Sequence, residues 1–113
     1  MHELPVTKGI FKTAMAEAEK QNANKIKTIT LKMGDNCDYV AEIIQEYFSM
    51  LAEDTIAKDC KIVANYVHTT VICKDCGREF TRQEFKDVCP YCKSEHLKLN
   101  IFKDFYIETI EIE

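Results

Sequence analysis

The feature that most constrains this chain is a spaced array formed by four of its six cysteines. Two residues separate the members of each pair and twelve separate the pairs, which are Cys73 with Cys76 and Cys89 with Cys92. Each pair can form a tight turn that directs backbone N–H groups at the sulfurs, and two such turns offer four thiolates in the tetrahedral arrangement suited to Zn²⁺. The array therefore predicts a structural zinc site held by these four cysteines.

The residue after each pair is expected to adopt the left-handed backbone conformation. Gly77 follows the first pair and adopts it without steric cost. Lys93 occupies the matching place after the second pair, where a residue with a side chain adopts this conformation at a steric cost. Because a segment this small has little core of its own, metal binding is expected to supply most of its folding free energy, on the order of 10 kcal/mol.

Other interpretations of the array stay open. Disulfides are disfavoured in a reducing compartment. The second pair alone resembles the active site of a glutaredoxin, but that motif lies between an early strand and a helix and does not face a second pair. Iron in a rubredoxin-like site fits the same spacing. A closed four-thiolate site has no open position for a substrate, so we expect a structural centre and not an enzyme.

The two remaining cysteines lie outside the array. Cys60 opens an apolar segment and is expected to be a small buried residue. Cys37 lies in a turn, and we assign no chemistry to it.

Charge and hydropathy limit the partners and the compartment. The chain has 15 basic and 19 acidic residues, a net charge of −4, so nucleic acid is not an expected partner. The N-terminal sequence has no basic segment followed by an apolar run, so no signal peptide is expected. No stretch approaches the roughly 18 to 20 apolar residues that span a bilayer. We therefore expect a cytoplasmic protein with no membrane association, in which thiols stay reduced.

Apolar periodicity predicts helices over residues 4–20 and 40–55 and a half-buried strand over residues 25–33. Further strands are expected over residues 60–71 and 104–112. In the last one the apolar residues change parity midway, which indicates a bulge or burial on both faces. The order is helix, strand, helix, strand, cysteine-rich insertion and strand. Because the last strand returns after the insertion, two chain segments are expected to connect the insertion to the rest of the chain.

The first three residues, Met1, His2 and Glu3, form a second candidate metal site. The α-amine, the His2 amide and the His2 imidazole lie close enough to chelate one ion, and Glu3 offers a fourth donor. Nitrogen-rich, near-planar donors suit Ni(II) or Cu(II) better than Zn(II). From the residues alone, a solvated terminal histidine is the competing interpretation.

With these features in place, the chain resembles the HypA/HybF family, the nickel metallochaperones of NiFe-hydrogenase maturation. The matching features are the opening Met1-His2-Glu3, the helix that begins Leu4-Pro5, the strand that ends at Gly34, the cysteine array and the closing segment 106–113. The resemblance extends over essentially the whole chain in register.

The resemblance implies an α/β (α+β) fold with two helices on a small three-stranded sheet and an inserted four-cysteine zinc ribbon. A nickel domain would comprise residues 1–70 plus 100–113, and the ribbon domain residues 71–99. Ni²⁺ would be transient cargo on Met1, His2 and Glu3, and the four cysteines would hold structural Zn²⁺. The implied function is delivery of Ni(II) toward the hydrogenase large subunit, together with a HypB-type GTPase, and some relatives serve urease maturation.

Some individual residues either depart from the family sequence or are additional candidate metal ligands. The loop after the first strand, residues 35–38, differs from the usual family sequence, and Asp38 is the nearest candidate for an extra nickel carboxylate. His96, four residues after Cys92, is a candidate for exchange onto zinc at low pH, and His68 is a weaker one. Solvated loop histidines are the competing interpretation.

Two other classes of function remain as alternatives. The first is a zinc-ribbon adaptor that binds protein or nucleic acid, but the ribbon carries four basic residues against four acidic ones and so has no basic stripe. The second is a thiol oxidoreductase, which needs a reactive thiolate at Cys89 or Cys92.

Overall fold

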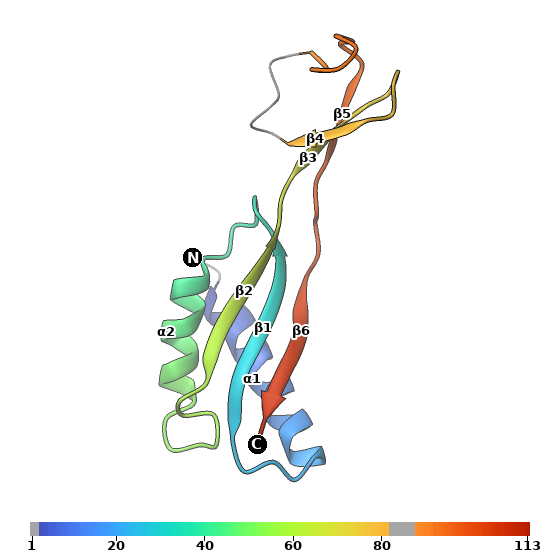
Figure 1. Ribbon diagram of the computed structural model, residues 1–113. Helices are drawn as coiled ribbons and strands as arrows, with labels where there is room; N and C mark the ends of the chain where they lie inside the picture. The colour runs from blue at the N-terminus through green and yellow to red at the C-terminus, as the bar shows by residue number, and fades with distance from the viewer. Residues whose placement is uncertain (1–2, 82–87) are drawn as a thin grey trace.

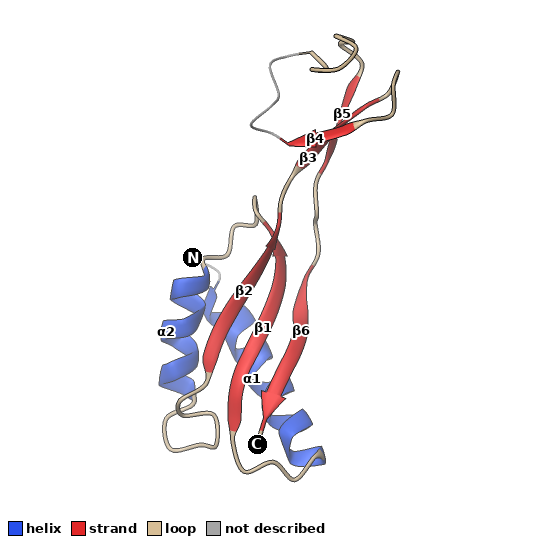
Figure 2. Ribbon diagram, in the orientation of Figure 1, coloured by secondary structure: helices blue, strands red, loops and turns tan. Residues whose placement is uncertain are grey.

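The computed structural model describes residues 3–81 and 88–113. Its helices and strands are α1 (Glu3–Lys20), β1 (Ile26–Gly34), α2 (Ala41–Leu51), β2 (Lys61–Val67), β3 (Thr70–Cys73), β4 (Glu79–Thr81), β5 (Leu97–Asn100) and β6 (Phe105–Ile112). The strands form two three-stranded sheets, ordered β2-β1-β6 and β4-β3-β5 (Figure 2). The fold is mixed α/β, as predicted.

The larger part, here called the α/β module, consists of α1, α2 and the sheet β2-β1-β6 (residues 3–67 and 105–113). In this sheet β1 is central, parallel to β2 and antiparallel to β6. Two parallel neighbours need a crossover, which α2 supplies between β1 and β2. Both helices lie on the same face of the sheet (Figure 1).

The core of the α/β module lies between this sheet face and the helices. Alternate residues of β1, namely Ile29, Leu31 and Met33, are fully buried there. The helices add buried apolar side chains: Ile10, Ala14 and Ala18 from α1 and Ile44 and Phe48 from α2. Each fully buried large apolar side chain stabilises the fold by roughly 1.5–3 kcal/mol. Half-buried polar residues of β1 alternate with the core residues: Thr28, Thr30 and Lys32.

The parity change predicted for the last strand is confirmed as a bulge in β6. Thr30 pairs with Thr109, whereas the next residue, Leu31, pairs with Ile107, so Glu108 is an extra residue in the ladder. The extra residue lets apolar side chains before and after it face the same core.

Two other predictions are wrong in their boundaries. The strand expected over residues 60–71 is two strands in different sheets, separated at His68 and Thr69. The β-branched sequence continues through this break, so local propensity gives no sign of it. The second helix ends at Leu51 and not near residue 55, because Asp54 has a φ of 63° and the Thr55 hydroxyl donates back to the Ala52 carbonyl at 2.6 Å.

The smaller part, here called the four-cysteine module, consists of the sheet β4-β3-β5 and the two cysteine pairs (residues 70–81 and 88–100). Two short segments carry it beyond one end of the α/β module (Figure 1). The molecule is therefore elongated, 57 × 28 × 17 Å, and its radius of gyration is 18.6 Å against about 13 Å for a compact chain of this length. Within the described residues, neither helix has the length and apolar composition to cross a membrane.

Candidate metal centre

The first cysteine turn begins where β3 ends. The backbone N–H of Gly77 donates to the Cys73 carbonyl at 2.9 Å, and the N–H of Cys76 points at the Cys73 sulfur at 3.5 Å. Gly77 has a φ of 76°, the conformation predicted for it. The turn therefore presents both thiols on one side of a closed loop.

The second cysteine turn repeats this geometry. The N–H of Lys93 donates to the Cys89 carbonyl at 2.9 Å, and the N–H groups of Tyr91 and Cys92 point at the Cys89 sulfur at 3.4 and 3.5 Å. Lys93 has a φ of 63°, so it adopts the strained conformation that the sequence predicted after the second pair. The two turns are thus equivalent in backbone geometry although only one contains glycine.

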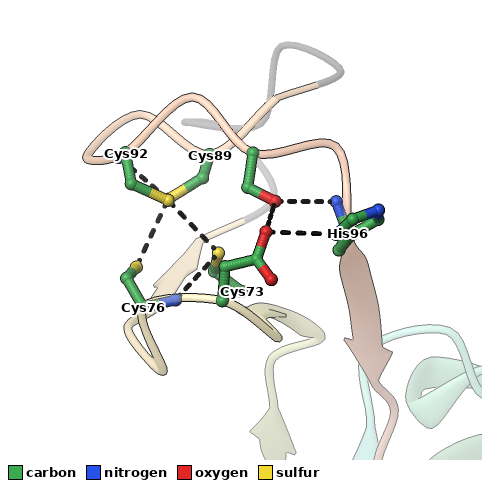
Figure 3. Close-up of polar contacts among 7 residues, drawn as sticks. Cys73, Cys76, Cys89, Cys92 and His96 are labelled. Atoms are coloured by element: carbon green, nitrogen blue, oxygen red, sulfur yellow. Dashed lines mark hydrogen bonds and ion pairs between the residues drawn. The ribbon is translucent and has the colours of Figure 1, made fainter.

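The two turns bring four sulfurs together at the end of the molecule (Figure 3). All four Sγ atoms lie within 4.8 Å of one another, with Cys73 and Cys92 3.5 Å apart and Cys76 and Cys89 3.7 Å apart. Zinc–sulfur bonds of about 2.3 Å at tetrahedral angles require sulfur separations of about 3.8 Å. The donor set therefore fits one tetrahedral metal ion. Among the described residues, no other group of three or more cysteine, histidine or acidic side chains gathers in this way.

The thiols differ in how readily they ionise. The N–H of Cys76 lowers the pKa of Cys73 to about 6, against the opposing effect of burial. Burial opposes ionisation of Cys89 as well, but the N–H groups of Cys92 and Tyr91 outweigh it and lower its pKa. The N–H of Ser94 favours the thiolate of Cys92, yet the neighbouring Cys73 sulfur and burial raise the pKa of Cys92 to about 12. Without a cation, the four thiols therefore resist complete ionisation. A divalent metal ion would remove this resistance by neutralising the thiolates.

A polar network supports the cluster from outside it. The Ser94 hydroxyl donates to the Asp75 carboxylate, and His96 Nδ1 lies 3.1 Å from the same carboxylate oxygen (Figure 3). Mainly because of the Ser94 hydroxyl, and with a further contribution from His96, the pKa of Asp75 is lowered. His96 therefore lies beside the thiol group and not within it. Sequence reasoning missed Asp75 and Ser94, and the only signal was the position of Asp75 between two cysteines.

The described part of the four-cysteine module has a small apolar core. Within residues 70–81 and 88–100, the buried residues are Val71, Cys73, Phe80 and Cys89, with Leu97 packed against them. Two of the four buried residues are thus candidate ligands. The fold of this module depends on the sulfurs as much as on its apolar side chains.

The N-terminal candidate site lies mostly outside the described residues, because Met1 and His2 are not among them. Glu3 begins α1 and only 1 % of its surface is exposed. The backbone N–H of Val40 lies near enough to its carboxylate to contribute to the lowered pKa of Glu3. The start of α1 therefore lies against the loop that leads into α2, and this loop contains the exposed Asp38.

The cysteines outside the array lie in or beside the core of the α/β module. Cys60 is 4 % exposed, and burial raises its pKa to about 11, which confirms it as a small buried residue. Cys37 is partly exposed and packs against the same core. Histidine 68 lies at the start of the first connecting segment, where its Nδ1 is 3.5 Å from an oxygen of Asp35.

A helix-covered sheet carrying an inserted pair of cysteine turns defines a two-module protein with one candidate metal site among its described residues. The chain belongs to the HypA family, described as "Hydrogenase/urease nickel incorporation, metallochaperone, hypA", whose model matches residues 1–112. This is a family of metallochaperones and not of enzymes.

Relatives named "Hydrogenase maturation factor HypA" match over the whole chain. The protein from Caldanaerobacter subterraneus subsp. tengcongensis is 35% identical over 114 residues, and the match covers 100% of both chains. The protein from Methanococcus maripaludis is 33% identical over 122 residues, covering 100% of this chain and 96% of its own.

Solved structures show the same fold. The structure described as "Solution structure of HypA protein" has a TM-score of 0.69 at 21% identity, over 100% of this chain and 97% of its own. The structure of the Ni metallochaperone HypA from Helicobacter pylori has a TM-score of 0.61 at 21% identity, over 99% and 97% of the two chains.

Proposed function

We propose that this chain carries Ni(II) to the large subunit of a nickel–iron hydrogenase during maturation and contains one structural Zn²⁺. The family match over residues 1–112 carries this proposal. The four clustered sulfurs support its zinc part, since their spacing fits a tetrahedral ion.

The zinc ligands are Cys73, Cys76, Cys89 and Cys92. A divalent ion neutralises thiolates that the module alone does not fully ionise, and it joins two turns that share little apolar contact. Four thiolates leave no coordination position for a substrate, so the role of the ion is structural.

The nickel ligands are Met1, His2 and Glu3, and Asp38 is a further carboxylate donor from the loop beside α1. The effect of the Val40 N–H on the pKa of Glu3 supports this arrangement, because it indicates that the loop lies near the start of the helix. A site with few side-chain ligands suits a carrier that must release its ion on contact. Because its donors bind in their deprotonated forms, nickel affinity falls as pH falls.

Two further proposals follow from the same function. The nickel domain comprises residues 1–70 plus 100–113 and the ribbon domain residues 71–99. The partners are a HypB-type GTPase, the hydrogenase large subunit and, in a urease-containing cell, urease maturation factors, and the protein works in the cytoplasm.

Calorimetric titration of Ni(II) into the zinc-loaded, untagged chain tests the proposal. We expect one labile nickel per chain, lost in His2→Ala and in a chain extended by residues before Met1. His68→Ala removes an exposed histidine from the segment between β2 and β3. This variant should bind nickel like the unaltered chain. If His2→Ala and the extended chain both bind nickel as tightly as the unaltered chain, the proposed site is wrong.

A further inference from the structure

The two modules are joined at one place, the end of β1. One connecting segment is His68 and Thr69, between β2 and β3, and the other is residues 101–104, between β5 and β6. Both rise side by side from the α/β module (Figure 1). The orientation of the four-cysteine module is therefore decided by what holds these few residues.

Asp35, the first residue after β1, holds the first segment with both carboxylate oxygens. Its Oδ1 accepts the Thr69 hydroxyl at 2.7 Å, and its Oδ2 accepts the Thr69 backbone N–H at 2.9 Å. The N–H of Asp35 also donates to the Val67 carbonyl at 3.0 Å, which extends the pairing of β1 and β2 by one residue. Thr69 is 4 % exposed although it lies in a connecting segment.

This contact is a tertiary one, because Asp35 and Thr69 are 34 residues apart in the chain. It is therefore not a local turn in which an aspartate bonds its own neighbours. The Thr69 hydroxyl, then its N–H, and to a lesser extent His68 lower the pKa of Asp35, so the contact is made by the carboxylate.

Gly34, directly before Asp35, lies against the second segment. A Cβ atom at this position would lie 2.3 Å from the carbonyl oxygen of Phe102. The ring of Phe102 also lies 5.9 Å from Lys32 Nζ and 6.3 Å from the ring of Tyr106. Two consecutive residues of the β1 end thus contact both connecting segments.

We propose that Asp35 is a positioning residue that locks the four-cysteine module in one orientation on the α/β module. Thr69 immediately precedes β3, and β3 ends at Cys73, about 13 Å further along an extended strand. A rotation at Thr69 is therefore carried directly to the first cysteine turn. Removing the Asp35 contact leaves each module folded but frees their relative orientation.

Amide residual dipolar couplings of the zinc-loaded full chain in a dilute aligned medium test this proposal. In the unaltered chain, one alignment tensor should fit the couplings of both modules. In Asp35→Ala, no side-chain acceptor is left for either Thr69 donor, so each module should still fit its own tensor while the single-tensor fit is lost. Thr69→Val, which removes the hydroxyl in a side chain of similar shape, should show the same change.

Two variants serve as controls. Thr69→Ser keeps the hydroxyl and the N–H, so it should retain the common tensor. Asp54→Asn removes an acidic charge from a turn beyond α2, where Asn also tolerates the observed φ of 63°, and should behave like the unaltered chain. A common tensor in both Asp35→Ala and Thr69→Val, or two tensors in the unaltered chain, would overturn the proposal. None of these measurements uses nickel, so they stand apart from any failure of the proposed nickel site.

Discussion

Replacing Gly34 by alanine should loosen the junction, and the size of the effect follows from one distance. The added Cβ would lie 2.3 Å from the Phe102 carbonyl oxygen, where ordinary contacts begin at 3.4 Å. The second connecting segment must therefore retreat by about 1 Å from β1. Forced displacement of packed backbone of this kind destabilises a protein by about 1–3 kcal/mol.

The chain provides a matched control for the same substitution. Gly9 lies on the exposed side of α1, and a Cβ added there meets nothing within 4 Å. Alanine in a helix interior is favoured over glycine by about 0.5–1 kcal/mol. Gly9→Ala should therefore stabilise the α/β module, whereas Gly34→Ala should destabilise it, although both add one methyl group.

Thermal unfolding of the three zinc-loaded proteins, followed by circular dichroism, measures this difference. A change of 1 kcal/mol moves Tm by about 4–8 °C in a domain of 60–100 residues. We expect the Tm of Gly34→Ala to lie below that of the unaltered chain and the Tm of Gly9→Ala above it. An unchanged or higher Tm for Gly34→Ala, with Gly9→Ala stabilised as expected, would refute the steric argument at the junction.

Three shorter predictions test other parts of the structure. Removing the metal with a chelator should abolish amide exchange protection in the four-cysteine module while the α/β module keeps its protection, as hydrogen exchange would report. Gln45→Leu should lower the free energy of unfolding by about 1–3 kcal/mol in urea titrations, because Gln45 Oε1 accepts the Ile62 N–H at 2.7 Å and its Nε2 donates to the Cys60 carbonyl at 3.2 Å. Asp35 has a lowered pKa in the folded state. Its contribution to the free energy of unfolding is therefore present above its unfolded pKa of about 3.9 and is lost as pH falls through the folded pKa. The stability curves of the unaltered chain and Asp35→Asn should therefore converge in acid, and curves that stay equally far apart would contradict this.

The cysteine turns were predictable from sequence because their chemistry is local. Two residues between thiols and a residue with positive φ after them define each turn, and the structure has this geometry at Gly77 and Lys93. The bulge in β6 was predictable for a similar reason, since a change of parity in one strand needs an extra residue. Each of these features is determined within about ten residues of chain.

The junction could not be predicted because its contacts join distant residues. Nothing near Thr69 in sequence indicates that Asp35 will bond it, and the β-branched run through residues 67–72 favours one uninterrupted strand. The polar network of Asp75, Ser94 and His96 depends in the same way on how two turns meet. At the N-terminus, only the family resemblance distinguished a metal site from a solvated histidine.

The two modules differ in what their buried cores are made of. Among the described residues, the α/β module has twelve buried core residues, whereas the four-cysteine module has four, of which two are cysteines. The start of α1 belongs to the α/β module, whose buried core contains no cysteine of the array. The two connecting segments, which contact the α/β module at Gly34 and Asp35, therefore join a module with a large apolar core to one in which the cysteines are half of the buried residues described.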